Sequence, residues 1–373
     1  MIFAILLCAT IALCIFSSTD FFVSFWRWQS RIHIGRWQDK ADWQKAVGEK
    51  CQKWLAHTPT IPIKDHDRLI LWDIIRRKYS SPTIQSWQKA GLVLGLCYHS
   101  ENCDFNFYHE IAKQSVNASP HIDVALMAYA ILVSFPKKAD ELKPLMDEVY
   151  QRILDTKGDN DTVPYRKGLT NIRFVDTLGF ICPFLTLYAK TYMVTEAALL
   201  AQKQLVEYDR ALLPNWGFPA HAFDIKQNAP LGLFDWGRGV GWYIIALLGM
   251  QRHTSNNVVK IKIEERIVTL GEKLLLCALP AGGFSYQLFN SSASAEGSAT
   301  VLATLIFKRC YEITNDGKYS KAVDSSLKRL MKMTRRNGAL DGCQGDTKGI
   351  GFYSSRFDIM PFAQGVLLFT LKD

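Results

Sequence analysis

The segment from Phe234 to Tyr243 combines two tryptophans, one arginine and three glycines in the order Phe-Asp-Trp-Gly-Arg-Gly-Val-Gly-Trp-Tyr. An indole face packs well against a sugar ring, so Trp236 and Trp242, with the fixed cation of Arg238 beside them, suit a sugar-binding platform. The glycines would let the backbone approach a ligand closely. The same residues also fit a tight loop before a buried helix, with both indoles in the core and Arg238 bound to a carbonyl group.

Two aspartates, Asp123 and Asp176, each stand where an apolar helix is expected to begin. The commonest role of an aspartate at that position is to cap the helix. A carboxyl group among apolar neighbours such as Phe174 and Leu178 would instead have its pKa raised by desolvation, which suits a group that holds and gives a proton near neutral pH. His221 precedes the tryptophan segment, where a structural histidine and a site histidine are both open interpretations.

The elements that must position these side chains are mainly helices. Apolar residues recur at three- and four-residue spacing, and strand-like alternation is limited to short pieces near 283–286 and 352–353. No Pro- or Ser-rich linker interrupts residues 27–373, so we expect one all-α domain of helical hairpins closed into a ring, with the chemistry in the loops at one rim. The expected helices include Trp43–Leu55, Leu69–Lys78, Ile84–Tyr98, Ile122–Phe135, Ala139–Leu154, Thr177–Tyr192, Glu196–Leu212, Trp242–Arg252, Lys260–Leu276, Ser298–Ile313 and Tyr319–Met333.

Residues 1–26 form a hydrophobic segment that we interpret as a transmembrane or anchor helix. The run is long enough to span a bilayer if Asp20 is tolerated near one end. No basic residue precedes it, whereas Arg27, Arg31 and Arg36 follow, which favours an uncleaved membrane anchor with the domain on the cytoplasmic side. An atypical export signal with the domain in a periplasm is the alternative.

The formal net charge of +9 and the sequence pI near 9.0 favour an anionic partner, which could be an acidic saccharide, a nucleic acid or a membrane surface. Helix-turn-helix, zinc-finger and ribonucleoprotein signatures are absent, which argues against nucleic acid. The sequence has no HExxH, P-loop or dinucleotide-binding fingerprint, so we expect no metal, nucleotide or redox cofactor. The nine cysteines form no CxxC pair, although Cys97 and Cys103 could pair in an extracytoplasmic domain.

A series of short motifs resembles the unsaturated glucuronyl and rhamnogalacturonyl hydrolases, glycoside hydrolase families 88 and 105. Their order and spacing together are more specific than any one of them, and they cover nearly everything after the N-terminal segment. The motifs are Trp87-Gln88 with Ala90-Gly91, Ile122-Asp123, Phe174-Val175-Asp176-Thr177-Leu178, Pro183-Phe184-Leu185, His221-Ala222-Phe223-Asp224, Trp236-Gly237-Arg238-Gly239-Val240-Gly241-Trp242, Glu296-Gly297-Ser298-Ala299-Thr300 and Gln364-Gly365.

The resemblance implies a toroid of six helical hairpins, the (α/α)6 barrel. It also implies a substrate: an acidic oligosaccharide, left by a polysaccharide lyase, with a 4,5-unsaturated uronic acid at its non-reducing end. By motif position, Asp176 is similar to the catalytic acid and base, and Asp123 to a second essential carboxylate that binds sugar hydroxyls and helps place the water. The positions similar to substrate-binding residues of the family are Phe174, His221, Trp236, Arg238 and Trp242.

The chain departs from the family pattern at three positions. Val240 stands where a polar Asn or Gln is usual, Gly237 where Ala is usual, and Gly297 where Ser or Thr is usual. We therefore expect a hydrolase that removes the unsaturated uronic acid by hydrating its vinyl ether. Two alternatives remain open: a catalytically reduced, membrane-attached relative that binds or helps process acidic envelope glycans, and an ordinary inverting glycosidase with Asp123 and Asp176 as its acid and base.

Overall fold

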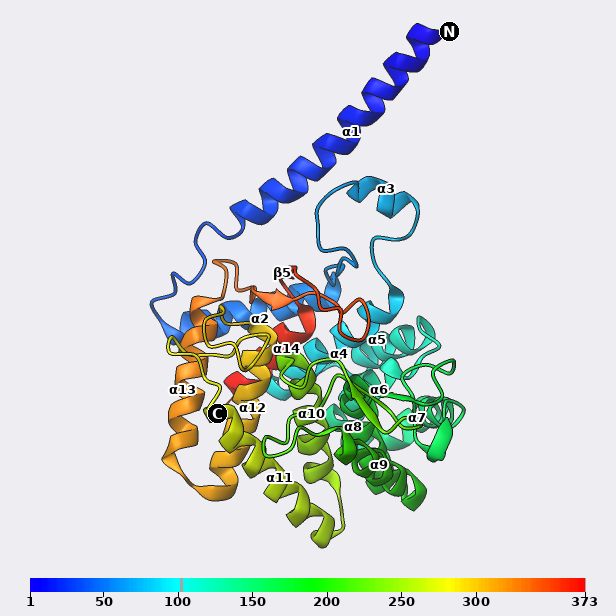
Figure 1. The fold of residues 1–373 in the computed structure, drawn as a ribbon, viewed down its shortest axis with the longest axis vertical. Helices are drawn as coiled ribbons and strands as arrows, with labels where there is room; N and C mark the ends of the chain where they lie inside the picture. Colours follow the sequence, from blue (N-terminus) through cyan, green and yellow to red (C-terminus); the bar gives the residue numbers. More distant parts are fainter. Residues whose placement is uncertain (101–102, 373) are drawn as a thin grey trace.

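The computed structural model describes residues 1–100 and 103–372, which contain a closed ring of helical hairpins and an N-terminal helix that projects from it (Figure 1). Six inner helices pack side by side, and the last of them packs against the first. This confirms the all-α, six-hairpin fold expected from the sequence. The inner helices are α4 (Pro82–His99), α6 (Ala125–Ser134), α8 (Val175–Tyr192), α10 (Gly237–His253), α12 (Gly297–Thr314) and α14 (Pro361–Leu371).

The outer helices cover the inner ring, one for each inner helix. An inner helix has neighbours on all sides and is apolar around its circumference, as in α6, where residues 125–132 are all buried. An outer helix is apolar along one stripe only, as in α13, where Tyr319, Ser326 and Leu330 are the buried residues. The outer helices are α2 (Lys40–Ala56), α5 (Phe105–Asn117), α7 (Ala139–Leu154), α9 (Thr195–Tyr208), α11 (Asn257–Leu275) and α13 (Gly317–Lys332).

Glycines allow α4 and α14 to close the ring with their backbones in contact. A Cβ atom built on Gly365 would lie 2.1 Å from the carbonyl oxygen of Gly91, and one built on Gly95 would lie 2.2 Å from the carbonyl oxygen of Gly365. Both distances are far shorter than any non-bonded carbon–oxygen contact. The first and last inner helices can therefore meet this closely only because none of these three positions carries a side chain.

Short strands at the rim differ from those expected. Residues 283–286 and 352–353 form no strand; isolated bridges occur at Gln287, next to the first range, and at Phe352, within the second. The strands observed instead hold loops against the helix ends, in two antiparallel sheets. They are β1 (Ile172–Phe174), β2 (Ala222–Asp224) and β3 (Ala229–Leu231) in one sheet, and β4 (Cys343–Gln344) and β5 (Phe357–Asp358) in the other.

Most expected helices are present, with three differences of substance. The helix expected over Leu69–Lys78 is only α3 (Ile70–Ile75), because Leu69 and Arg77 adopt left-handed backbone conformations on either side of it. The helices α5 and α14 were not among those expected. Cys97 and Cys103 are free thiols in the structure.

The N-terminal helix α1 (Ile2–Gln29) extends away from the barrel and has no buried residue (Figure 1). Its most apolar stretch has a mean hydropathy of 2.4, and it is the one helix of the described chain that is long and apolar enough to cross a membrane. Helix α1 continues to Gln29, beyond the segment boundary expected at residue 26.

Ion pairs tie the end of α1 to loops of the domain. Arg31 donates two hydrogen bonds to Asp341, at 2.6 and 2.7 Å, and Arg335 contacts the same carboxylate at 2.6 Å. Arg27 pairs with Asp67 at 2.7 Å. Two of the arginines used to assign the cytoplasmic side are thus engaged by carboxylates of the domain. This gives them a structural role and removes much of their weight as a signal of sidedness.

Candidate active site

Asp176 lies in the first turn of α8, at the rim of the barrel. Its side chain makes no cap hydrogen bond, so the helix-capping interpretation is wrong for this residue. The N–H of Val175 donates to the carbonyl oxygen of His221 at 3.0 Å, which ties the start of α8 to the chain entering β2. The Nε2 atom of His221 lies 3.9 Å from Asp176 Oδ2, and that oxygen is buried with no hydrogen-bond partner in the described chain. A buried carboxyl oxygen without a partner is rare in a folded protein, which marks Asp176 as a candidate functional group.

The surroundings of Asp176 favour its protonated form. Burial raises its pKa to about 7, against the attraction of Arg238, and the negative charges of Asp346 and Asp123 act in the same direction as burial. The side chain is still 16% exposed. Asp176 is therefore a carboxyl group that keeps its proton close to neutral pH and can be reached from outside, as a general acid must be.

Asp123 lies in a short 3-10 turn, Ile122–Val124, directly before α6, and does not cap that helix either. The side chain is fully buried, and burial raises its pKa to about 6 although the Arg166 guanidinium acts in the opposite direction. The Nη1 atom of Arg166 lies 3.1 Å from Asp123 Oδ2. A buried carboxyl group with a single cation at its outer edge is typical of a binding or catalytic site.

His221 is held rigidly beside these carboxyl groups. The hydroxyl of Tyr208 donates to its carbonyl oxygen at 3.1 Å, and its ring packs against Trp236 and Phe174, with ring centroids 4.6 and 5.5 Å apart. Burial, together with the charge of Arg238, lowers its pKa to about 4. The imidazole is therefore neutral at physiological pH, and its Nδ1 atom is buried without a partner in the described chain.

Arg238 lies in the first turn of α10 rather than in a loop. Its guanidinium is buried, donates to the carbonyl oxygens of Gln344 and Gly345, the latter at 2.7 Å, and lies 5.3 Å from the Trp236 ring centroid. This is the carbonyl-binding arrangement that the sequence left open. The cation nevertheless acts on Asp176 and His221, since it opposes the pKa increase of the first and adds to the pKa decrease of the second.

The two tryptophans of the 234–243 segment are buried, each 1% exposed. Trp236 donates from Nε1 to the side chain of Gln344 at 2.9 Å. Trp242 belongs to an aromatic cluster inside the ring, together with Trp87, Phe180 and Phe362. Neither indole presents a free face to a sugar in this conformation, and stacking on a sugar stays a prediction. Of the expected aromatic contacts, Phe174 is the one that is only half-buried.

The glycines of this segment are closely packed inside the protein, and a role in opening the backbone to a ligand stays a prediction. A Cβ on Gly239 would lie 2.5 Å from the Trp236 ring, and one on Gly241 would lie 2.2 Å from Leu302.

Packing also explains the departures from the family pattern. Val240 is 1% exposed and packs among apolar neighbours, which suits an apolar side chain at this position. A Cβ at Gly237 would lie 2.7 Å from the Ala299 side chain, and one at Gly297 would lie 2.7 Å from Cys343 Sγ.

Sequence reasoning missed two residues of the site, Asp346 and Tyr353, both in the loop between β4 and β5. Burial raises the pKa of Asp346, against the attraction of Arg238. Tyr353 packs against His221 and Trp236, and its hydroxyl accepts a hydrogen bond from the N–H of Leu233 at 2.9 Å. Polar and aromatic residues among Gly345, Gly349 and Gly351 were the available signal for a functional loop.

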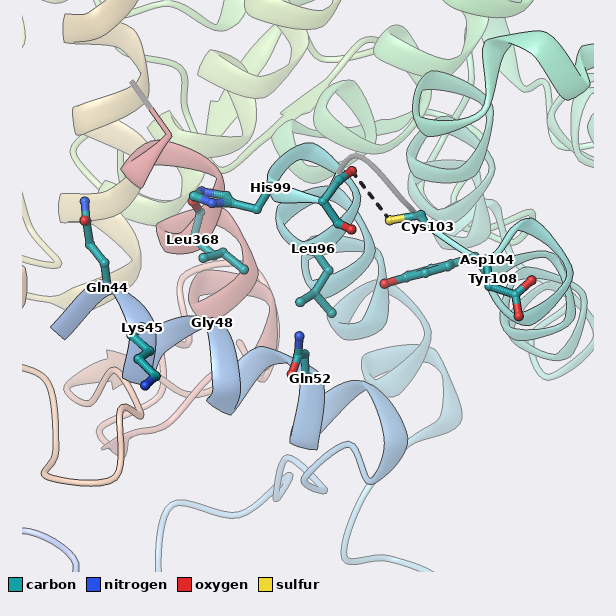
Figure 2. Close-up of a pocket in the computed structure, with 11 residues that line it drawn as sticks. Gln44, Lys45, Gly48, Gln52, Leu96, His99, Cys103, Asp104, Tyr108 and Leu368 are labelled. Atoms are coloured by element: carbon teal, nitrogen blue, oxygen red, sulfur yellow. Dashed lines mark hydrogen bonds between the residues drawn. The ribbon is translucent and has the colours of Figure 1, made fainter. Parts of the chain in front are cut away.

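Two cavities differ in their relation to these residues. One of about 450 Å³ lies at the rim and is lined by Tyr353, Tyr286, Phe357 and neighbouring loop residues. A larger one of about 590 Å³ lies at the C-terminal end of α4, between α2, the start of α5 and Leu368, and contains none of the candidate residues (Figure 2). Neither cavity is lined by Asp123, Asp176 or His221, and the smaller one meets the site through Tyr353. In the described residues no group of three or more His, Cys, Asp or Glu could hold a metal ion.

The raised pKa of Asp176 predicts how activity should depend on pH. Because the acid must be protonated to act, kcat/KM should fall as the pH rises through about 7. The charge of Asp346 contributes to that pKa, so Asp346→Asn should move the alkaline limb to lower pH. The exposed Asp324→Asn is the matched control and should leave the limb in place. A limb that does not move in Asp346→Asn would show that the two carboxyl groups do not interact.

Comparison with known proteins rests on structure alone, because no protein-family model and no curated protein matches the sequence. A possible member of glycoside hydrolase family 105 from Salmonella enterica serovar Paratyphi A superposes with a TM-score of 0.74 and 14% identity, over 90% of this chain and 94% of that one. An unsaturated glucuronyl hydrolase from Bacillus sp. GL1, responsible for glycosaminoglycan degradation, gives 0.63 and 13%, over 88% and 93%. A polysaccharide lyase gives 0.63 and 12%, over 88% and 96%.

These superpositions establish the fold. With sequence identities this low, the reaction has to be argued from the site. One of these structures is named as a polysaccharide lyase and the others as hydrolases, so proteins with this fold carry the names of different reactions. The chain has the six-hairpin fold of the glycoside hydrolase family 88 and 105 structures and of the unsaturated glucuronyl hydrolases.

Proposed function

We propose that this protein is a glycoside hydrolase that removes a 4,5-unsaturated uronic acid from the non-reducing end of acidic oligosaccharides. The observation that carries the proposal is Asp176, a rim carboxyl group whose pKa is raised to about 7 and whose Oδ2 atom has no partner in the described chain. His221 lies beside it, and the charges of Asp123, Asp346 and Arg238 act on it. The motif resemblance and the structural neighbours support the same activity.

The proposed reaction uses one carboxyl group twice. Asp176 gives its proton to C4 of the unsaturated sugar, which places positive charge on C5 and its ring oxygen. A water molecule adds to C5 and returns a proton to the Asp176 carboxylate, so the enzyme is restored. The resulting hemiketal opens to a ketone at C5, and the hemiacetal left at C1 breaks down to an aldehyde and releases the next sugar.

The other residues would bind and orient the substrate. Asp123, once ionised, would accept hydrogen bonds from sugar hydroxyls and help place the water, with Arg166 on its outer edge. His221 is neutral and rigid and can exchange a hydrogen bond through its free Nδ1. The outer face of Phe174 would contact the sugar ring. The cations Arg166 and Arg238 would favour an anionic sugar at this rim.

Membrane attachment through α1 belongs to the same proposal. The helix is apolar, has no buried residue and points away from the barrel, and its end is fixed to the domain by ion pairs. Asp346 and Tyr353 lie in the loop that follows β4, and β4 begins two residues after Asp341, which pairs with Arg31. We therefore place the site on an anchored domain, with the side of the membrane left open.

The test follows the ultraviolet absorbance of the 4,5-double bond in unsaturated disaccharides prepared with lyases from several acidic polysaccharides. Full-length protein in detergent should remove the band from at least one of them, and the responding disaccharide names the substrate class. Circular dichroism of the same sample shows that the protein is folded. A folded protein that leaves the band unchanged with every disaccharide would overturn the proposal.

A second candidate, a membrane-attached relative that binds acidic glycans without hydrolysing them, is favoured by one observation. Arg238 donates hydrogen bonds to backbone carbonyl groups, and Trp242 is enclosed in the core. Two of the residues expected to contact the substrate are thus already engaged inside the protein. Saturable binding of an unsaturated disaccharide without loss of its absorbance band would support this second function.

A further inference from the structure

The loop between α2 and α4 exposes an unusual number of large apolar side chains. Around the short helix α3, the exposed fractions are 52% for Leu69, 44% for Trp72, 50% for Ile74 and 61% for Ile75. Ile70, on the opposite face, is buried. Large apolar residues gathered on one surface point to a contact that excludes water.

The charges around this apolar surface have one sign. Arg68, Arg76, Arg77 and Lys78 are all exposed, and none of them forms an ion pair with another described residue. The acidic residues of the same loop are paired, and the side chains of Asp67 and Asp73 are also nearly buried. These pairs are Asp65 with Lys348, Asp67 with Arg27 and Arg356, and Asp73 with Lys64.

Helix α3 is fixed to α1 at one level along that helix. The carboxylate of Asp20 accepts hydrogen bonds from the backbone N–H groups of Leu69 and Ile70, at 2.7 and 3.0 Å. Phe16 packs edge-to-face on Trp72, with ring centroids 6.3 Å apart. Both elements lie on the same side of the barrel (Figure 1). The exposed residues of α3 thus lie beside residues 16–20 of α1.

The position of this contact along α1, at residues 16–20, matches the edge of a bilayer. Residues 2–19 contain no charged residue. At 1.5 Å per residue they span about 27 Å, close to the roughly 30 Å of a hydrocarbon core. Asp20, the first charge of the helix, would then lie at the membrane surface. Its pairing with two backbone N–H groups also explains how a carboxylate is accommodated there.

We infer that α3 and the basic residues around it form a second membrane contact, which binds the surface of an anionic bilayer where α1 leaves it. Trp72, Ile74 and Ile75 enter the boundary between headgroups and acyl chains, and Arg68, Arg76, Arg77 and Lys78 pair with lipid phosphates. The inference rests on the proposed membrane attachment through α1. Two contacts, unlike one, fix how the domain sits on the membrane.

The test measures whether Trp72 meets lipid. Full-length protein is reconstituted into vesicles of phosphatidylcholine, with and without phosphatidylglycerol. The phosphatidylcholine is either unmodified or carries acyl chains brominated near the headgroup, which quench nearby indoles. The Trp72 signal is the difference between wild type and Trp72→Phe. Most of this difference signal should be lost with brominated lipid, and more is lost when phosphatidylglycerol is present. Arg76→Glu/Arg77→Glu/Lys78→Glu should remove the dependence on phosphatidylglycerol.

Leu199→Trp is the matched control, because it adds an exposed indole on α9, and that indole should not be quenched. Flotation of the same vesicles after an alkaline carbonate wash reports insertion of α1 independently. Protein that does not float overturns the membrane attachment and this inference with it. Protein that floats with Trp72 unquenched overturns only the α3 contact and would assign the apolar surface to a protein partner.

Discussion

Replacing Asp176 with asparagine is expected to reduce turnover of the unsaturated disaccharide by at least about 10³-fold, because the amide has no proton to give to C4 and general acid–base groups contribute up to about 10⁴-fold. The fold should be unaffected, since the side chain makes no cap hydrogen bond and the amide has nearly the same shape. Loss of absorbance under single-turnover conditions is the measurement. A variant that keeps most of its activity would exclude Asp176 as the acid.

The same substitution should change stability in a pH-dependent way. The pKa of Asp176 is about 7 in the folded protein, above its ordinary value of 3.8, so the folded state holds the proton more tightly than the unfolded chain does. The stabilisation from that proton is complete below the ordinary pKa and is lost as the pH rises through about 7. At higher pH the buried charge costs up to roughly 4 kcal/mol, at 1.36 kcal/mol per pKa unit.

Asp176→Asn carries no such charge, so its Tm should exceed that of wild type at pH 8 and equal it at pH 4. Thermal unfolding followed by circular dichroism at the two pH values makes the comparison. Asp324 is exposed, so Asp324→Asn serves as a control, and its Tm difference from wild type should not change between the two pH values. Equal Tm values of Asp176→Asn and wild type at pH 8 would mean that Asp176 is not desolvated in solution.

Gly365→Ala should be strongly destabilising for a change that adds one methyl group. The new Cβ would lie 2.1 Å from backbone atoms of Gly91 and 2.4 Å from the backbone nitrogen of Leu92, and a backbone cannot rotate away as a side chain can. Helices α4 and α14 would have to separate, at a cost of about 3 kcal/mol or more, at the upper end of what overpacking produces. Urea unfolding monitored by tryptophan fluorescence gives the change in the free energy of unfolding.

Gly317→Ala is the matched control for this prediction. Gly317 lies in the first turn of α13, and a Cβ there would meet nothing within 4 Å. Alanine has the higher helix propensity, so this variant should be as stable as wild type or slightly more stable. A similarly small effect for Gly365→Ala would show that α4 and α14 are not in backbone contact in solution.

The sequence was most informative where periodicity is strong. The amphipathic helix α7 runs from Ala139 to Leu154, as expected. Helix α14, which closes the ring, was missed; it is apolar on every face and gives no periodic signal, although α6, which is equally apolar, was expected. Local pattern also cannot show that Leu69 and Arg77 take left-handed conformations, and these shorten the helix expected between them.

The candidate site was predictable in part for a similar reason. Asp123 and Asp176 were each expected at the start of an apolar helix, which marks them as rim residues, and the structure places both in partly or fully buried surroundings. The burial of Trp236 and Trp242 depends on neighbours such as Gln344 and Phe362, which are more than 100 residues away along the chain. The Asp346 loop reaches the site through the same long-range packing, so neither outcome could be read from a short segment.

The meeting of α4 with α14 also sets an order of events during synthesis. Gly91 and Gly365 are 274 positions apart, from 365 − 91. At 5–20 residues per second, α4 therefore waits about 15 to 55 s for its partner. Throughout that time the apolar face of α4 that α14 later covers is open, and an incomplete ring is a target for aggregation and for chaperones. Contacts between distant segments also fold slowly. The domain is thus most vulnerable in its unfinished state.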